Sequence, residues 1–302
     1  MSELKKEKNS LKNEMTEDNA PMFDREEWIQ QKRAERDFAF ELIDQAAEQL
    51  LKEPSGVKTC LELQSRFPRY SVGNILLLSV QKPDASKICD FRTWKENGVS
   101  IRKGETGIII LEPGNEYKRA DGSVGVTFNT KHVFDFSQTT AETQPEVQIN
   151  RDDRLLIKAL VHNAPCEIKT DDRFLFPEGM IAWYDPESRT IFTKSGQESR
   201  LLFSEIAREL ALAHIDASGH ERFNRDNSFF TATCVSYVLC RRNGVDVSAF
   251  SFTELPENIK EKGASAVREE LGKIRMIANT ISSDMENLYG RPKDFRSQGE
   301  AR

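Results

Sequence analysis

The segment spanning residues 198–216 constrains the fold of this chain most, because its apolar residues recur at helical spacing. The apolar side chains expected on one face are Phe203, Ile206, Ala207, Leu210 and Ala213. Residues three and four apart lie on the same face of an α-helix, so this stripe predicts a helix that is buried along one side. The residues expected on the other face are Glu205, Arg208, Glu209, Leu212 and Asp216.

The centre of this helix has the spacing of a zinc-peptidase motif but lacks its ligands. In a His-Glu-x-x-His helix, two imidazoles four residues apart hold the metal and the glutamate serves as general base. Here the five positions read Arg208-Glu209-Leu210-Ala211-Leu212. Leucine has no lone pair to donate, and a guanidinium has no acceptor atom and stays protonated. We therefore interpret Glu209 as a vestige of the base or as a solvated surface residue, with ligand positions lost at Arg208 and Leu212.

The segments beside this helix support the comparison. Residues 180–192 read as two short strands around the turn at Asp185-Pro186. A strand pair leading into such a helix resembles the gluzincin-like peptidase half of ArdC-type antirestriction proteins. The resemblance implies a third, acidic ligand from the following helix, but residues 227–244 contain neither Asp nor Glu. Three ligand positions are missing together, which indicates an inactive site without a metal or another cofactor.

A succession of motifs fills residues 57–139. They are Arg69-Tyr70-Ser71 with Asn74, Gln81-Lys82-Pro83, Trp94, Lys103-Gly104-Glu105 and the closing Phe134-Asp135-Phe136-Ser137-Gln138-Thr139. Their order and spacing resemble the N-terminal single-strand-binding domain of the ArdC family. The resemblance extends more weakly to about residue 288. It implies a protein of mobile genetic elements that covers incoming single-stranded DNA during conjugation and shields it from restriction.

The residues of this segment also suit single-stranded DNA, which offers base faces to aromatic side chains and phosphates to Lys and Arg. The candidate contacts are Arg69, Tyr70, Asn74, Lys82, Lys87, Arg92, Trp94, Arg102, Lys103 and Lys131. Residues 57–138 hold 12 Lys and Arg against 9 Asp and Glu, whereas the whole chain has a net charge of -6. Any DNA site is therefore a local patch. Two alternatives are that Trp94 belongs to the core and that Asn74 helps to cap a helix over residues 75–80.

Composition and turn signals, together with the resemblance, divide the chain into five parts and predict the fold class α+β. The parts are a disordered leader (1–22), an α/β DNA-binding-like domain with a leading helix (23–139), a linker (140–150), a mostly helical zincin-like domain with a small β-sheet (151–290) and a tail (291–302). The leading helix should run from about Asp24 to Lys52 and bury Trp28, Phe38, Leu42, Ile43, Ala46 and Leu50. Further helices are expected over residues 230–242 ending at Gly244, over 264–288, and over 152–162 with Leu155, Leu156, Ala159 and Leu160 inward.

Cysteine usage and hydropathy indicate the compartment. The five cysteines are scattered without a C-x-x-C pair, which is typical of reduced thiols. No apolar run approaches the length of a membrane span. We expect a soluble, cytoplasmic protein without a membrane partner, whose oligomeric state the sequence leaves open.

Two other functions remain open at this point. In the first, a DNA-activated zinc peptidase recruits His214, His220 or Glu221 as relocated ligands beside Glu209. In the second, the second domain is a protein-interaction module in which Arg208 pairs with Glu205 or Glu209 in place of a metal. Single-stranded DNA binding and a protein partner on the second domain are compatible with each other.

Overall fold

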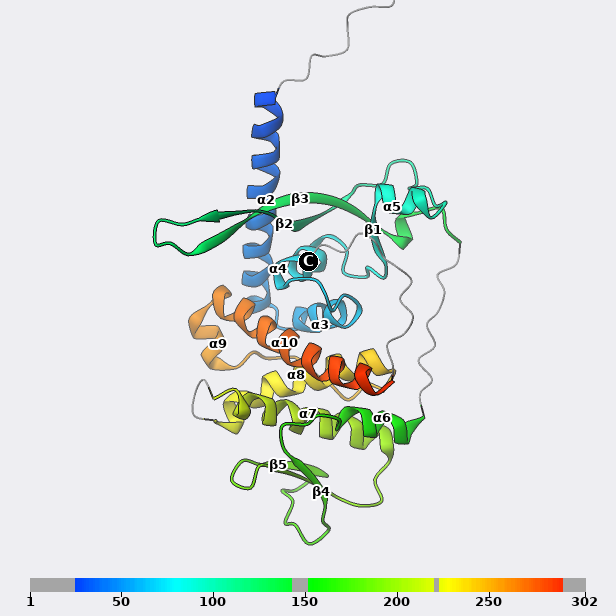
Figure 1. Ribbon diagram of the computed structural model, residues 1–302, viewed down its shortest axis with the longest axis vertical. Helices are drawn as coiled ribbons and strands as arrows, with labels where there is room; N and C mark the ends of the chain where they lie inside the picture. Colours follow the sequence, from blue (N-terminus) through cyan, green and yellow to red (C-terminus); the bar gives the residue numbers. More distant parts are fainter. Residues whose placement is uncertain (1–24, 143–151, 220–222, 290–302) are drawn as a thin grey trace, which may run out of the picture.

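The chain folds into a helical body that carries two small β-sheets (Figure 1). The computed structural model describes residues 25–142, 152–219 and 223–289. The expected leader (1–22), the expected tail (291–302) and most of the expected linker (140–150) lie outside the described residues. Helices predominate over strands along the described chain, so the α+β class is confirmed.

The helices and strands follow one another from α2 to α10. In the first half they are α2 (Arg25–Lys52), α3 (Gly56–Arg66), α4 (Val72–Gln81), β1 (Ile88–Asp90), α5 (Phe91–Glu96), β2 (Ile108–Lys118), β3 (Val124–Asp135) and the 3-10 helix η1 (Phe136–Gln138). In the second half they are α6 (Asp153–Leu160), β4 (Glu167–Thr170), β5 (Ala182–Asp185), β6 (Thr190–Thr193), α7 (Ser199–Ala217), α8 (Arg225–Asn243), α9 (Glu257–Lys262) and α10 (Ala264–Tyr289). None of the described helices combines the length and the apolar character that crossing a bilayer requires.

The first sheet has the strand order β1–β3–β2, and both pairs are antiparallel. β2 and β3 form a long hairpin whose register places Ile108 opposite Val133, with an irregularity between Pro113 and Glu116. Figure 1 shows the tip of the hairpin at one end of the sheet and α5 at the other. β1 leads directly into α5, whose N-terminus is capped where Asp90 accepts a hydrogen bond from the Thr93 N–H at 2.7 Å.

Helix α4 closes the free edge of β2 with two carboxamides. Asn74 donates from Nδ2 to the Leu111 carbonyl and accepts from the Leu111 N–H, both at 2.8 Å. Two turns further on, Gln81 makes the same pair of hydrogen bonds to Ile109, both at 2.9 Å. Edge strands otherwise expose unpaired backbone groups that can pair with another chain. These two side chains therefore protect the edge of the sheet.

Helix α2 is packed along only part of its length. Its buried residues run from Ala39 to Leu50, and Figure 1 shows its N-terminal part extending past the sheet. The expectation for Ile43, Ala46 and Leu50 is confirmed. The expectation that Trp28 and Phe38 are buried is wrong, because the buried face of the helix begins only at Ala39.

In the second half, α7 and α8 pack along each other, and α6 and α10 lie against them. A sheet of order β4–β6–β5 lies next to α7, with β4 parallel and β5 antiparallel to β6. The strand pair expected over residues 180–192 is confirmed as β5 and β6. Gly244 ends α8 in the left-handed conformation, with φ of +68°, as expected for a helix C-cap. The expectation that Leu156, Ala159 and Leu160 of α6 point inward is confirmed, whereas Leu155, which was expected inward as well, is exposed.

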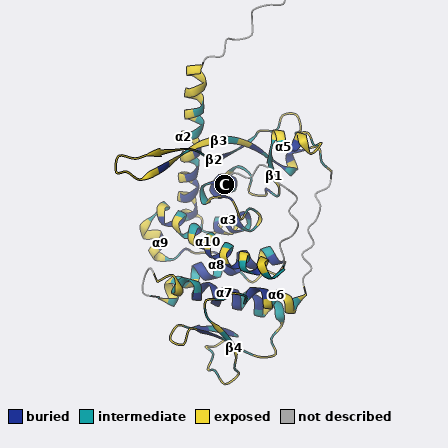
Figure 2. Cartoon of the chain, viewed as in Figure 1, coloured by how far each residue is buried: buried dark blue, intermediate teal, exposed yellow. Residues whose placement is uncertain are grey.

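Helices of the two halves share one core (Figure 2). Glu62 on α3 accepts hydrogen bonds from the Tyr237 hydroxyl and, at 3.0 Å, from Arg241 Nε, both on α8. Gln64 on α3 donates to the Leu271 carbonyl on α10 at 3.0 Å. The second half of the chain therefore supports the helices on which the first sheet rests.

Candidate functional site

Helix α7 directs Glu209 toward β5 rather than toward solvent. Glu209 and Leu212 are both fully buried, so the expectation that they lie on a solvent-facing side of the helix is wrong. The physical reason is that α8 packs along α7 while β5 covers another side, so more than one face of α7 is inside. The spacing of apolar residues in the sequence predicts one buried face of a helix. A second buried face depends on which elements pack against the helix in the folded chain.

Arg225, the first residue of α8, pairs with this buried carboxylate. Arg225 Nη2 lies 2.7 Å from Glu209 Oε1 and 2.8 Å from Oε2. The guanidinium carbon also lies 3.5 Å from the centroid of the Trp183 ring, close enough for a cation–π interaction. A carboxylate can be buried only where it is paired with a positive charge and hydrogen-bonded. Arg225 supplies both the charge and the hydrogen bonds.

The same two side chains occupy the outer edge of β5. The Tyr184 N–H donates to Glu209 Oε2 at 2.8 Å, and the Tyr184 carbonyl accepts from Arg225 Nη1 at 3.5 Å. An added peptide strand would pair with such backbone groups at a strand edge. The Tyr184 hydroxyl in turn donates to Asp216 at 2.7 Å. Burial and this neighbouring carboxylate raise the pKa of Tyr184.

Arg208 lies beside this pair and has partners of its own. It forms an ion pair with Glu205, three residues earlier, and its Nε lies 3.6 Å from Glu209 Oε1. Its guanidinium carbon lies 5.2 Å from the centroid of the Phe229 ring. The pairing of Arg208 with Glu205 or Glu209 expected from the sequence is present. The more direct partner of Glu209, however, is Arg225.

The aromatic candidates for base stacking lie inside the first half. Trp94 is 3% exposed, and its indole N–H donates to the Phe134 carbonyl at 2.9 Å. Tyr70 is 9% exposed and stacks on Phe67 with ring centroids 5.4 Å apart, and burial raises the pKa of Tyr70 to about 12. Neither ring presents a free face to a base, so both are corrected to core residues.

Asn74 is corrected in the same way. It is buried, and its carboxamide makes the hydrogen bonds that protect the β2 edge. The Ser71 hydroxyl accepts a hydrogen bond from the Asn74 N–H at 3.3 Å, as the capping alternative expected. The sequence motif around Asn74 is therefore explained by the sheet and the helix cap rather than by DNA.

The basic candidates are partly or fully exposed, but most of them have an acidic neighbour. The ion pairs are Lys82–Asp84 (2.9 Å), Arg92–Glu96 (2.8 Å), Arg102–Glu105 (3.4 Å), Lys131–Asp90 (2.9 Å) and Lys131–Glu112 (3.6 Å). Lys87 lies 5.6 Å from the centroid of the Trp94 ring, and Lys103 is exposed in the turn at Gly104. Arg69 is exposed, and its carbonyl accepts from Arg275 Nη2 at 3.3 Å.

Comparison with known proteins shows which proteins parts of the chain resemble. A family model described as the N-terminal domain of anti-restriction factor ArdC matches residues 40–155. The chain is ArdC-like. The metal-free crystal structure of antirestriction protein ArdC from plasmid R388 has a similar fold, with a TM-score of 0.50 and 16% identity over 72% of this chain and 86% of that chain. The Mn(II)-bound structure of the same protein gives a TM-score of 0.48 and 16% identity over 72% and 90%.

The ArdC-like chain also has a relative in Bacillus anthracis, the uncharacterized protein pXO2-81. The two are 23% identical over an alignment of 326 residues, which covers 86% of this chain and 54% of the relative. The chain therefore spans about half the length of that relative.

The residues around Glu209 in this ArdC-like chain do not fit a zinc ion. Zinc ligands need lone pairs, whereas Arg208 and Leu212 have none to donate and Arg225 holds a positive charge against Glu209. Burial lowers the pKa of His214, which lines a separate pocket with residues of α10. His220 and Glu221 lie outside the described residues. Among the residues that the structure describes, no group of three or more His, Cys, Asp or Glu side chains could hold a metal ion.

Two residues of the ArdC-like chain were not among the sequence candidates. Arg225 stands 16 residues after Glu209, and no local pattern links the two. Phe91, the first residue of α5, is 57% exposed, although an aromatic residue directly after a strand suggests a core position. The Val99 N–H donates to the Trp94 carbonyl at 3.0 Å and holds the next turn against α5. We call this surface the α5 patch and define it by Lys87, Phe91, Arg92, Lys95 and Lys103.

Proposed function

We propose that this chain binds single-stranded DNA of a mobile or conjugative element, in an antirestriction role, and that its peptidase-like half is catalytically inactive. The proposal places DNA binding in residues 23–139 and the inactive half in residues 151–290, within a cytoplasmic protein. The match of residues 40–155 to the ArdC N-terminal domain supports it. All five cysteines are free thiols, which is consistent with a reducing compartment.

The exposed ring of Phe91 carries the DNA-binding part of the proposal. It is 57% exposed, and the other residues of the α5 patch, Lys87, Arg92, Lys95 and Lys103, are exposed as well on α5 and the segments next to it in the chain. An aromatic platform for bases surrounded by cations for phosphates is the combination that single-strand binding uses. Because the whole chain has a net charge of -6, such a local surface is the place where a polyanion can be held.

The Glu209–Arg225 pair carries the inactive part of the proposal. A zinc peptidase needs its glutamate free to act as general base. Here Arg225 donates hydrogen bonds to both carboxylate oxygens of Glu209, and the Tyr184 N–H donates a further hydrogen bond to Oε2. The β5 edge at Tyr184, where an extended peptide would pair, is engaged by the same two side chains. Both parts of a peptidase site are therefore occupied by groups of the chain itself.

Fluorescence anisotropy with a labelled single-stranded oligonucleotide tests the DNA-binding part. Phe91→Ala should weaken binding by roughly 1–3 kcal/mol, the contribution of one stacked base. Tyr117→Ala is the matched control, because Tyr117 is an exposed aromatic at the other end of the sheet. With about four phosphates neutralised, log affinity should fall against log salt with a slope of roughly -3. No binding at low salt, or an equal loss in both variants, would contradict the α5 patch.

A protein partner on the second half is a second candidate that one observation favours. Leu175 is 92% exposed between Phe174 and Phe176, whose ring centroids lie 4.9 Å apart. Phe174 also stacks on Phe192 of β6, with ring centroids 4.3 Å apart, so the residue before Leu175 is held in place by aromatic packing. Apolar anchors of this kind are typical of protein interfaces. Leu175→Asp should abolish co-purification of such a partner and leave DNA affinity unchanged, whereas unchanged co-purification would exclude this surface.

A further inference from the structure

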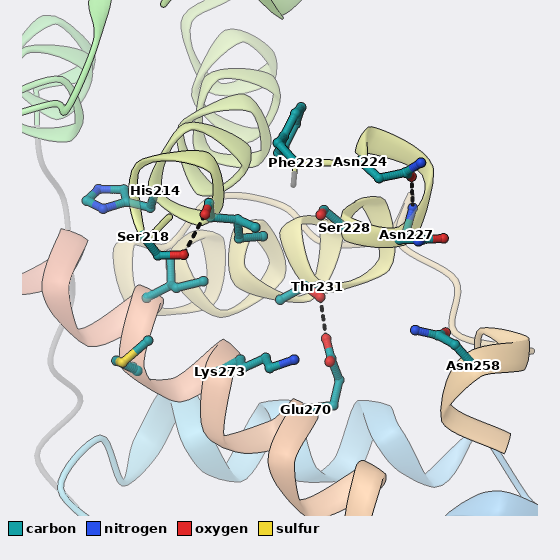
Figure 3. Close-up of a pocket in the computed structure, with 13 residues that line it drawn as sticks. His214, Ser218, Phe223, Asn224, Asn227, Ser228, Thr231, Asn258, Glu270 and Lys273 are labelled. Atoms are coloured by element: carbon teal, nitrogen blue, oxygen red, sulfur yellow. Dashed lines mark hydrogen bonds between the residues drawn. The ribbon is translucent and has the colours of Figure 1, made fainter. Parts of the chain in front are cut away.

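A pocket of about 380 Å³ lies where the C-terminal end of α7 and the N-terminal end of α8 meet α9 and α10 (Figure 3). It is separate from the α5 patch and does not include Glu209 or Arg225. Ile215, Met276 and Ile277 contribute apolar lining. A volume of this order suits a small molecule, and a mostly apolar lining with a few polar groups is usual for such sites.

Glu270 places a largely buried carboxylate in this pocket. Its Oε1 accepts a hydrogen bond from the Thr231 hydroxyl, and Figure 3 shows the carboxylate directed from α10 toward α8. Burial raises the pKa of Glu270, while the Thr231 hydrogen bond and the charge of Lys273 act in the opposite direction. Oε2 accepts no hydrogen bond from any other described residue, so it is available to a ligand.

Lys273 places the opposite charge one turn further along α10. Figure 3 shows its side chain extended toward Glu270, and it acts on Glu270 through its charge without a hydrogen bond. The side-chain polar groups of Asn227, Ser228 and Asn258 also line the pocket and make no hydrogen bond within the described residues. The pocket therefore holds a negative group, a positive group and neutral donors and acceptors that are all open to a ligand.

We propose that this pocket binds a free α-amino acid with an apolar side chain. The ligand ammonium group lies against Glu270 Oε2, and the ligand carboxylate lies against Lys273, with Ser228 and Asn227 as further hydrogen-bond donors. The ligand side chain packs against Ile215, Met276 and Ile277. A zwitterion satisfies both charged groups, whereas a simple amine or a simple acid leaves one of them unmatched.

Isothermal titration calorimetry on the full chain tests this site directly. L-leucine, L-methionine and L-phenylalanine are the probes, and the comparators are 3-methylbutylamine and 4-methylpentanoate, which each lack one charged group of leucine. At least one of the three amino acids should bind saturably, and both comparators should bind at least about tenfold more weakly than leucine. Glu270→Gln and Lys273→Met should each weaken amino acid binding by about tenfold or more, which corresponds to one charge-assisted hydrogen bond.

Lys158→Met is the matched control, because Lys158 is an exposed lysine on α6 outside the pocket, and this variant should bind as the wild type does. Circular dichroism verifies that each variant is folded, and Lys273→Met decides the question alone if Glu270→Gln does not fold. No heat with any of the three amino acids at about 10 mM overturns the proposal, as does equal binding of the comparators or unchanged affinity in the variants. DNA binding through the α5 patch is independent of every one of these outcomes.

Discussion

Arg225 Nη2 lies 2.7 and 2.8 Å from the two carboxylate oxygens of Glu209, a pairing that joins the start of α8 to the middle of α7. Glu209 stands at the position of the general base in the zinc-peptidase motif. The cation that meets it here is a guanidinium of the chain itself, stacked on Trp183. Glu209 is therefore one half of a buried structural ion pair.

The stability of this pair is the first prediction. Arg225→Ala leaves the buried Glu209 carboxylate without its partner, so the free energy of unfolding should fall by roughly 3–5 kcal/mol in urea denaturation. Glu209→Leu combined with Arg225→Leu should lose less than Arg225→Ala alone, because no charge is then left buried. Arg173→Ala is the control, since the side chain of Arg173 is 93% exposed and its pair with Asp171 contributes at most about 1 kcal/mol. An Arg225→Ala variant as stable as this control would show that the pair is not structural.

Asn74 provides a second prediction, which separates a structural role from a DNA contact. Asn74→Ala should lower the free energy of unfolding by roughly 1–3 kcal/mol, because the N–H and carbonyl of Leu111 lose their partners at the sheet edge. Faster hydrogen exchange at the Leu111 amide should accompany the loss. Asn115→Ala, at an exposed position of the hairpin, should change neither quantity. An Asn74→Ala variant that loses DNA affinity but keeps its stability would indicate that Asn74 contacts DNA.

Asp90 provides a prediction for acid stability. Burial alone raises the pKa of Asp90, but hydrogen bonds from Thr93 and Lys131 outweigh it and lower the pKa to about 2. An acid whose pKa is lower in the folded state stabilises the fold above its unfolded pKa, so this stabilisation is lost as the pH falls from about 4 to about 2. In Asp90→Asn the unfolding free energy should be lower at pH 7 and should decline less over that acid range. Asp37→Asn, on an exposed part of α2, should follow the wild-type curve, and a parallel Asp90→Asn curve would refute the assignment.

The cations of the α5 patch provide a prediction about salt. Removing Lys95 and Lys103 together should weaken binding to single-stranded DNA and make the salt slope shallower by roughly 1.4, because each phosphate contact contributes about 0.7. Lys158→Ala removes a lysine from α6, outside the patch, and should leave the slope unchanged. A slope that changes equally in both variants would indicate a general charge effect instead of a site.

Much of the fold could be predicted because many helices, turns and helix ends depend on residues that are close together in the sequence. The apolar spacing of α7 and α10, the Asp185-Pro186 turn between β5 and β6, and Gly244 at the end of α8 all have a physical cause within a few residues. The chemistry of the two side chains also shows, without the structure, that Arg208 and Leu212 cannot act as zinc ligands.

The rest depended on contacts between distant segments. Arg225 meets Glu209 across the connection between two helices, and nothing near either residue marks the pair. Trp94 and Phe91 stand three residues apart on α5, yet Trp94 is 3% and Phe91 is 57% exposed. The sequence shows an aromatic residue at both positions but not which of them faces the sheet. Which ring could stack a base therefore became visible only in the folded chain.

Metal analysis of the purified, full-length chain tests the central claim most directly. After incubation with zinc and removal of the unbound ion, mass spectrometry of the metal content should find far less than one zinc per chain. Glu209→Gln should give the same value. One tightly held zinc ion per chain in the wild type, lost in Glu209→Gln, would contradict the account, because Arg225 could not then be the cation that Glu209 binds.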